Sequence, residues 1–284
     1  MHQQVVVGTN TSMGEVRSIC ARHRLSFPIV LMDEAGQASE PSCLIPLTLG
    51  AEWVLVGGDM AQLPPTILSE NARKVLGFNS QSGGSQYGRF SELGVREFSL
   101  TLQYRMHPHI REFPSATFYG GRLREDPAAP PDTNVPQPRK HDGRCAFRWP
   151  SELLGGNVGS GGGGGGGPPP PPYPVAFLDV GYGEERQRDS TIYNVDEASL
   201  ALQLLLAMAA DPSVESVVVL TPYNGQVQYL HERLDKARPV ISPLRGGGDG
   251  DGGGGPGSPK PLHIAVHTVD GFQGHEADVI LMST

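Results

Sequence analysis

The sequence predicts an α/β protein whose parallel sheets are covered by helices on both faces. Three observations favour this class. Short, continuous apolar runs recur along the chain, which is typical of strands buried on both faces. Helical segments separate several of these runs. Motifs rich in carboxylates, amides and glycine follow some of the runs, and parallel sheets bind ligands at the carboxyl ends of their strands.

Six apolar runs are the predicted strands of these sheets. They lie at residues 28–32, 53–57, 174–179, 216–220, 263–268 and 279–282. Residues 194–210 are rich in Ala and Leu and contain no helix breaker before Pro212, so they predict a well-packed helix. Residues 223–237 predict a second, amphipathic helix.

Two low-complexity segments interrupt this alternation. Residues 155–172 include seven consecutive glycines and then five prolines, and residues 245–260 consist almost entirely of Gly, Asp and Pro. Such segments bury too little apolar surface to offset the entropy of ordering them. Both are therefore expected to be disordered inserts within a domain, because a predicted strand follows each. The Pro-rich residues 120–150 are expected to run over the surface.

Composition excludes several classes of protein. The chain has 284 residues, 38% of them hydrophobic, and a net charge of −8, which argues mildly against a nucleic-acid partner unless a local groove is basic. Its three cysteines lie far apart with no CxxC pair, so a disulfide framework or zinc knuckle is not expected. No apolar run approaches the roughly 20 residues that span a membrane, and the N-terminus lacks a secretory pattern. We expect a soluble protein of the cytoplasm or nucleus.

The pair Asp33-Glu34 directly follows the first predicted strand. An Asp at this position can hold the hydration shell of Mg²⁺, and the next Glu can polarise an attacking water. Taken alone, an acidic pair after a strand is more often a solvated turn. The following Gln37 and the motifs further along the chain favour the catalytic interpretation.

Asp59 repeats this arrangement after the second predicted strand, and Gln62 follows three residues later. Gln62 is placed to bond the γ-phosphate of ATP or the attacking water. Asp59 can equally cap a helix, and the two interpretations are compatible.

The run Gln103-Tyr104-Arg105-Met106-His107-Pro108 carries the second set of candidates. An Arg that reaches a γ-phosphate neutralises charge in the transition state. Tyr104 offers a flat face on which a base can stack. An Arg paired with an acidic neighbour and a Tyr in the core would explain the same two residues without a ligand.

Near the end of the chain, Gly271 and Gly274 surround Gln273 after a predicted strand. Backbone amides at such glycines can approach a phosphate closely, and Glu276 can accept hydrogen bonds from ribose hydroxyls. Glycine-containing turns of this length are common, so this run is weak evidence by itself.

Thr9, Thr221 and Tyr223 follow apolar runs as well. Hydroxyls and ring faces at these places suit contacts to the sugar-phosphate backbone of a single strand. Turn and cap roles explain them equally without further context.

Taken together and in this order, four of these runs resemble the motifs of a superfamily 1B helicase. The group in question contains the nonsense-decay helicase, senataxin and the immunoglobulin mu-binding helicase. The runs that resemble its motifs II, III, IV and V are residues 33–37, 58–63, 103–108 and 269–276. The runs 177–181, 194–198 and 221–227 also recur in that group.

The resemblance implies ATP and Mg²⁺ bound between two RecA-like domains of the P-loop NTPase type, with single-stranded RNA or DNA drawn across them. Residues 1–98 would form the C-terminal part of the first domain, which is incomplete, and residues 99–284 most of the second. A monomer and no membrane contact are expected. Carried over residue by residue, the implied nucleotide contacts are Asp33 on Mg²⁺, Glu34 on the water, Gln62 and Arg105 on the γ-phosphate, Tyr104 near adenine and Glu276 near ribose.

The same resemblance implies that Thr9, Thr221 and Thr268 contact the nucleic-acid backbone. Two family motifs are missing from these 284 residues. No G-x-x-x-x-G-K-[ST] phosphate loop occurs, and neither does the last motif with its second catalytic Arg. His275 also stands where the family usually has Arg. The chain resembles the middle of a helicase core and is expected not to hydrolyse ATP by itself.

Two rival interpretations come from other classes. One is a non-catalytic interaction module that keeps the helicase fold, against which the intact Asp33, Glu34, Gln62 and Arg105 argue. The other is an unrelated metal-dependent hydrolase that uses Asp33, Asp59 and His107, which lacks any tight cluster of His and Asp ligands.

Overall fold

The computed structural model describes residues 5–75, 84–125, 174–181, 183–211, 213–241 and 262–284. The chain divides into two compact units, Met1–Leu100 and Thr101–Thr284. Both expected inserts, residues 155–172 and 245–260, lie outside the described residues, as do residues 126–150 of the expected surface segment. No helix in the described ranges is long and apolar enough to cross a membrane.

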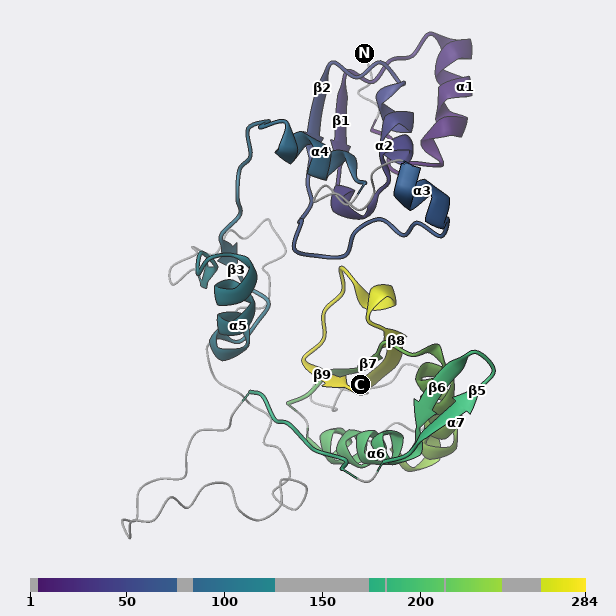
Figure 1. The fold of residues 1–284 in the computed structure, drawn as a ribbon, viewed down its shortest axis with the longest axis vertical. Helices are drawn as coiled ribbons and strands as arrows, with labels where there is room; N and C mark the ends of the chain where they lie inside the picture. Colours follow the sequence, from purple (N-terminus) through teal and green to yellow (C-terminus); the bar gives the residue numbers. More distant parts are fainter. Residues whose placement is uncertain (1–4, 76–83, 126–173, 182, 212, 242–261) are drawn as a thin grey trace, which may run out of the picture. The chain divides into compact units, whose positions relative to one another are not determined.

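The first unit is built on two parallel strands, β1 (Ile29–Met32) and β2 (Trp53–Val56). Both match predicted strands. Figure 1 shows α1 and α2 beside them. The helical elements of this unit are α1 (Met13–His23), η1 (Ala35–Gln37), α2 (Glu40–Leu47), α3 (Glu70–Val75) and α4 (Gln86–Glu92). An ion pair between Arg89 and Glu40 links α4 to α2.

Helices cover only one face of this two-stranded sheet in the described part of the chain. Val30 and Met32 are buried with Cys43 of α2, whereas Ile29 and Leu31 are 65% and 71% exposed. In the strand register Leu31 lies opposite Leu55, which is 65% exposed. The expectation of a sheet covered on both faces is therefore wrong for the described residues of this unit.

The second unit contains a parallel three-stranded sheet in the order β8-β7-β9. Its strands are β7 (Ser216–Thr221), β8 (His263–Thr268) and β9 (Val279–Met282), and all three match predicted strands. The central strand β7 is the most apolar, and five of its six residues are buried. This is the burial expected of a central strand in a parallel sheet.

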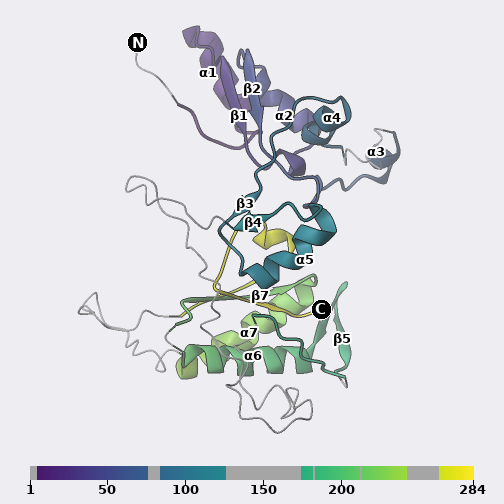
Figure 2. The same cartoon turned by 90° about the vertical axis from the view of Figure 1, so that its left-hand side faces the viewer.

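Two helices cover this sheet, α6 (Val195–Ala209) and α7 (Asn224–Ile241), and Figure 2 shows them side by side along β7. Both were predicted. The side chain of Asn194 accepts hydrogen bonds from the backbone amides of Asp196 and Glu197, which caps the start of α6. Leu205, Met208 and Leu230 are fully buried in the core between helices and sheet.

The remaining elements of this unit were not predicted. They are the parallel pair β3 (Leu102–Gln103) and β4 (Arg124–Glu125), the helix α5 (Pro108–Phe118), the antiparallel pair β5 (Glu185–Arg188) and β6 (Thr191–Asn194), and the short 3-10 helix η3 (Asp270–Phe272).

The strand expected at residues 174–179 is wrong, because this segment forms no ladder pairing with any described strand. Val175 and Phe177 are 62% and 88% exposed, and only Leu178 of this run packs against the core. An apolar run alone does not make a strand when no neighbouring strand offers hydrogen-bond partners.

Candidate nucleotide site

Two carboxylates follow the parallel strands of the first unit. Asp33 comes directly after β1, and Asp59 lies three residues beyond β2. The two strands are paired up to Met32 and Val56, which lie opposite each other. The segments that follow the two strands therefore leave the sheet at the same edge. Sequence reasoning predicted this placement, because the carboxyl ends of adjacent parallel strands meet at one edge.

Three glycines let the two strand ends approach each other closely. A Cβ atom added to Gly57 would lie 3.3 Å from Oδ1 of Asp33, and one added to Gly36 would lie 3.1 Å from the carbonyl oxygen of Asp59. One added to Gly58 would lie 2.9 Å from the backbone nitrogen of Gly36. Side chains at these positions would push the two carboxylate segments apart, so the glycines belong to the architecture of the site.

The backbone at Glu34 is in the left-handed region, with φ of 50°. A residue other than Gly seldom adopts this conformation, and it tends to occur at functional sites. Oδ1 of Asp33 accepts a hydrogen bond from the Glu34 backbone N–H at 2.9 Å, and Nε2 of Gln37 donates to Oε2 of Glu34 at 3.2 Å. The turn thus holds two exposed carboxylates side by side, with an amide orienting the second.

Asp59 organises the turn that follows β2. Its Oδ1 accepts from the Ala61 backbone N–H at 2.9 Å, and its Oδ2 accepts from Nε2 of Gln62 at 3.1 Å. Asp59 therefore stabilises a turn, and the alternative that it caps a helix is wrong, because no helix begins here. The bond to Asp59 holds the side chain of the exposed Gln62 next to the carboxylate.

Tyr87 is a neighbour of this site that sequence reasoning missed. A Cβ on Gly58 would lie 3.3 Å from the Tyr87 ring, which packs beside the Asp33 and Asp59 segments. Burial raises the pKa of the Tyr87 hydroxyl above its usual range, and the charges of Glu97 and Asp59 raise it further. Tyr87 lies on α4, far from the motifs in sequence, so only the fold reveals its role.

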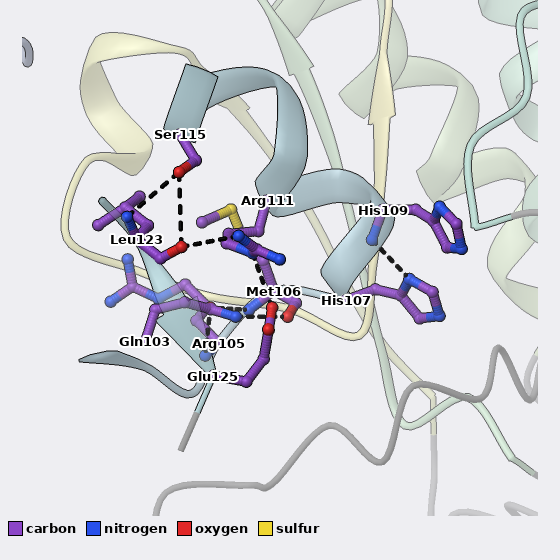
Figure 3. Close-up of polar contacts among 9 residues, drawn as sticks. All are labelled: Gln103, Arg105, Met106, His107, His109, Arg111, Ser115, Leu123 and Glu125. Carbon is purple, nitrogen blue, oxygen red and sulfur yellow. Dashed lines mark hydrogen bonds and ion pairs between the residues drawn. The ribbon is translucent and has the colours of Figure 1, made fainter. Parts of the chain in front are cut away.

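In the second unit, the Gln103 side chain builds the turn that presents Arg105 (Figure 3). Its Oε1 accepts from the backbone N–H groups of Arg105 and Met106 at 3.1 and 2.7 Å, and its Nε2 donates to the Met106 carbonyl at 2.9 Å. One side chain therefore closes both ends of the turn. The Arg105 side chain itself is exposed.

His107 and Arg111 anchor this turn to α5 (Figure 3). Nδ1 of His107 accepts from the His109 backbone N–H at 3.2 Å and caps the helix, whose first residue is Pro108. Arg111 forms an ion pair with Glu125 of β4 at 2.7 Å and donates to the Leu123 carbonyl at 2.7 Å. His107 is buried and engaged in capping, which argues against its use as a metal ligand.

The structure brings together two predicted nucleotide ligands from distant parts of the second unit. Nε of Arg105 lies 3.2 Å from Oε2 of Glu276, and both side chains are more than half exposed. An exposed pair of this kind is weak, about 0–1 kcal/mol, so an incoming phosphate can displace the carboxylate from Arg105. Tyr104, which precedes Arg105 in the sequence, is half-buried. In the segment between β8 and β9, Gly274 precedes Glu276 by two residues and has a φ of 84°, a backbone conformation that glycine adopts readily.

The residues predicted to touch nucleic acid differ in their exposure. Thr9 is exposed and bonds Ser12 at the start of α1. Tyr223 is 37% exposed, and Thr268 accepts a hydrogen bond from the Gly271 backbone N–H at 3.1 Å. Thr221 is fully buried, and its Oγ1 accepts from the Tyr223 N–H at 3.3 Å, a geometry that suits positioning Tyr223.

Among the described residues there is no group of three or more His, Cys, Asp or Glu side chains that could hold a metal by themselves. This is compatible with Mg²⁺ bound through nucleotide phosphates, since Mg²⁺ at such sites keeps several waters and takes only one or two carboxylates. Asp33 has the position and the chemistry for that role.

Comparisons with known proteins agree with the motif order. Two family models, each described as an AAA domain, match residues 83–284 and residues 1–70. The chain belongs to the superfamily 1B helicases.

Three curated relatives illustrate the similarity to this helicase family. Regulator of nonsense transcripts 1 of Dictyostelium discoideum is 31% identical over 90% of the chain and 16% of its own length. An uncharacterized ATP-dependent helicase of Methanocaldococcus jannaschii is 28% identical over 98% of the chain and 34% of its own length. ATP-dependent helicase NAM7 of Saccharomyces cerevisiae is 31% identical over 90% of the chain and 22% of its own length. The chain thus spans between 16% and 34% of the length of these three relatives.

Proposed function

We propose that this helicase chain is the section of an ATP-dependent RNA or DNA helicase or translocase that handles nucleotide and single-stranded nucleic acid. Its two units would be parts of two RecA-like domains. The family supports ATP as the nucleotide and Mg²⁺ as its usual companion. The observation that carries the proposal is the placement of Asp33 and Asp59 at the ends of adjacent parallel strands, held close by three glycines.

Each nucleotide ligand has a role that follows from its chemistry. Asp33 would bind the hydrated Mg²⁺, and Glu34, oriented by Gln37, would accept the proton of the attacking water. Gln62, held by Asp59, would contact that water or the γ-phosphate. Arg105 would neutralise the charge that develops on the γ-phosphate in the transition state.

The remaining ligands would hold the nucleoside and the nucleic acid. Tyr104 would stack near adenine, Glu276 would accept from the ribose hydroxyls, and the Gly274 backbone would lie close to a phosphate. The hydroxyls of Thr9 and Thr268 and the ring of Tyr223 would contact a single strand, with Thr221 holding Tyr223 in place. We expect the chain to act as a monomer.

The nucleotide half of the proposal can be tested by binding. Fluorescent ATP should bind the purified chain weakly and more tightly with Mg²⁺ than without it. Asp33→Asn should remove the Mg²⁺ dependence, because the neutral amide is a poor Mg²⁺ ligand. Glu34→Gln should retain binding, and Glu52→Gln, an exposed carboxylate that precedes β2, is the matched control. A Mg²⁺ dependence that survives Asp33→Asn would contradict the assignment.

A second titration tests Arg105 and the nucleic-acid partner. Arg105→Ala should weaken the binding of fluorescent ATP, whereas Arg233→Ala, which removes an exposed cation of α7, should not. Fluorescence anisotropy should show single-stranded oligonucleotides binding with an affinity that falls as salt rises. Binding of oligonucleotide without any binding of nucleotide would instead favour the non-catalytic interaction module.

A further inference from the structure

Three aromatic rings form a continuous stack where the chain leaves β8. The ring centroids of His267 and Phe272 lie 5.8 Å apart with planes 25° from parallel. Those of Phe272 and His275 lie 5.6 Å apart with planes 35° from parallel. The Phe272 ring therefore contacts both imidazoles, stacked with that of His267 and tilted against that of His275. None of the nucleotide contacts proposed above uses these rings.

Backbone hydrogen bonds fix the loop that carries this stack, the yellow segment between β8 and β9 in Figure 1. The Val269 N–H donates to the Thr221 carbonyl at 3.2 Å, and the His275 N–H donates to the Phe272 carbonyl at 3.1 Å. Oγ1 of Thr268 accepts from the Gly271 N–H at 3.1 Å. The rings are thus held in place before any ligand arrives, which lowers the entropy lost on binding.

The two imidazoles of the stack are more exposed than the Phe272 ring. His267 and His275 are exposed, whereas Phe272 is half-buried. Flat, exposed rings on a fixed loop are the means by which proteins hold unpaired bases, because every base has a face on which it can stack. Thr268 is the last residue of β8 and pairs with Thr221 of β7, two residues before Tyr223. Hydroxyl and ring groups for an adjoining sugar-phosphate therefore lie at the same sheet edge.

We propose that this stack, defined by His267, Phe272 and His275, binds an unpaired nucleobase on the ring of His267 or His275. The inference rests on the proposed function, since it names the base contact of a protein that handles single strands and nucleotides. The base can come from a nucleic-acid strand or from a free nucleotide, because the stacking chemistry is the same. In either case Phe272 is a positioning residue that holds the two imidazoles, and His267 and His275 are the residues that touch the base.

The fluorescence of 2-aminopurine tests the stack, because this base loses emission when it stacks on a ring. One arm uses a single-stranded oligonucleotide with a central 2-aminopurine, and the other uses free 2-aminopurine nucleotide. Titrating the full chain should quench one or both probes. His267→Ala combined with His275→Ala should remove the quenching, and His267→Phe with His275→Phe should restore it because the rings return. His263→Ala, which removes an exposed imidazole at the start of the same strand, is the matched control.

Affinity for an oligonucleotide that lacks bases separates failure of the stack from failure of the proposed function. The double alanine variant should bind a normal oligonucleotide about fivefold or more weakly, the effect of losing one stacked base. It should bind the base-free oligomer as the wild-type chain does, with the same salt dependence. If the wild-type chain binds the base-free oligomer and quenches neither probe, the stack proposal is overturned and the proposed function stands. If it binds neither oligomer nor nucleotide, both are overturned.

Discussion

In the Gln103–Pro108 segment, some residues stabilise the turn and one presents an exposed charge. Gln103 closes the turn through three hydrogen bonds, and His107 caps α5. Arg105 is left exposed with only a weak partner in Glu276. The role of Arg105 could be predicted from the sequence because of its charge. The role of Gln103 could not, because hydrogen bonds from its side chain to the backbone of the same turn depend on the three-dimensional geometry.

Replacing Gln103 by Leu should therefore disturb both stability and presentation of Arg105. Three hydrogen bonds at a half-buried turn are lost, and we expect the free energy of unfolding to fall by about 1–3 kcal/mol. Gln203→Leu, on the exposed face of α6, should change it by less than about 0.5 kcal/mol. Denaturant titration of both variants provides the measurement. Equal stability of the two would show that the turn does not depend on the Gln103 amide.

At the scale of elements, the sequence was most informative where apolar residues form continuous runs. The strands β7, β8 and β9 and the Ala- and Leu-rich helix α6 carry such runs and were predicted, and α7 was predicted from its amphipathic pattern. The pair β5 and β6 was missed because its strands, ERQR and TIYN, are mostly polar and lie in part on the surface. At the site, the carboxylates of β1 and β2 were placed from sequence, whereas Tyr87 and the ring stack required the three-dimensional packing.

A buried polar network joins three elements of the second unit. Gln226 of α7 is 2% exposed, exchanges two hydrogen bonds with the Asn194 backbone, and donates to Oγ of Ser283 after β9 at 2.9 Å. Oγ of Ser283 in turn donates to Oε2 of Glu197 at 2.6 Å. Such networks are costly when one member is removed, because its partners remain buried without a bond.

Gln226→Leu should accordingly lower the free energy of unfolding by about 1–3 kcal/mol, because the half-buried Asn194 backbone and the buried Ser283 hydroxyl lose a hydrogen-bond partner. The neighbouring Gln228 is exposed on the same helix, so Gln228→Leu supplies a matched control with a change below about 0.5 kcal/mol. Thermal or urea unfolding of the two variants would decide the matter. A Gln226→Leu protein as stable as the control would mean that an apolar side chain serves equally well there.

The open face of the β1–β2 sheet gives a prediction of a different kind. Leu31 and Leu55 lie opposite each other and are 71% and 65% exposed. Replacing both by Thr should reduce the binding of a hydrophobic dye, because apolar surface is removed. Stability should change by less than about 1 kcal/mol, since Thr suits strands and neither side chain is buried. Val30→Thr, on the buried face of β1, should instead destabilise the protein. Undiminished dye binding in the double variant would show that the dye reports another surface.

At the scale of the whole molecule, each family model matches most of one compact unit. One model matches residues 1–70, within the first unit, and the other matches residues 83–284, which include all of the second. The assignment of the units to two RecA-like domains remains a prediction, because it depends on the arrangement of the units around a nucleotide. The motifs predict which residues would meet that nucleotide. The chemistry they can complete depends equally on which phosphate ligands the polypeptide contains.

These 284 residues contain no G-x-x-x-x-G-K-[ST] loop, whose backbone amides and Lys neutralise the β- and γ-phosphates in P-loop enzymes. Mg²⁺ on Asp33 and the guanidinium of Arg105 would offset part of the phosphate charge, but none of the proposed contacts replaces the lysine and backbone amides of the loop. We therefore expect phosphate release by the purified chain to equal the buffer blank, with or without single-stranded RNA or DNA. Oligonucleotide binding in the same sample would confirm that the protein is folded. Steady ATP hydrolysis that disappears in a Glu34→Gln variant would contradict this prediction and would mean that other groups of the chain replace the loop lysine.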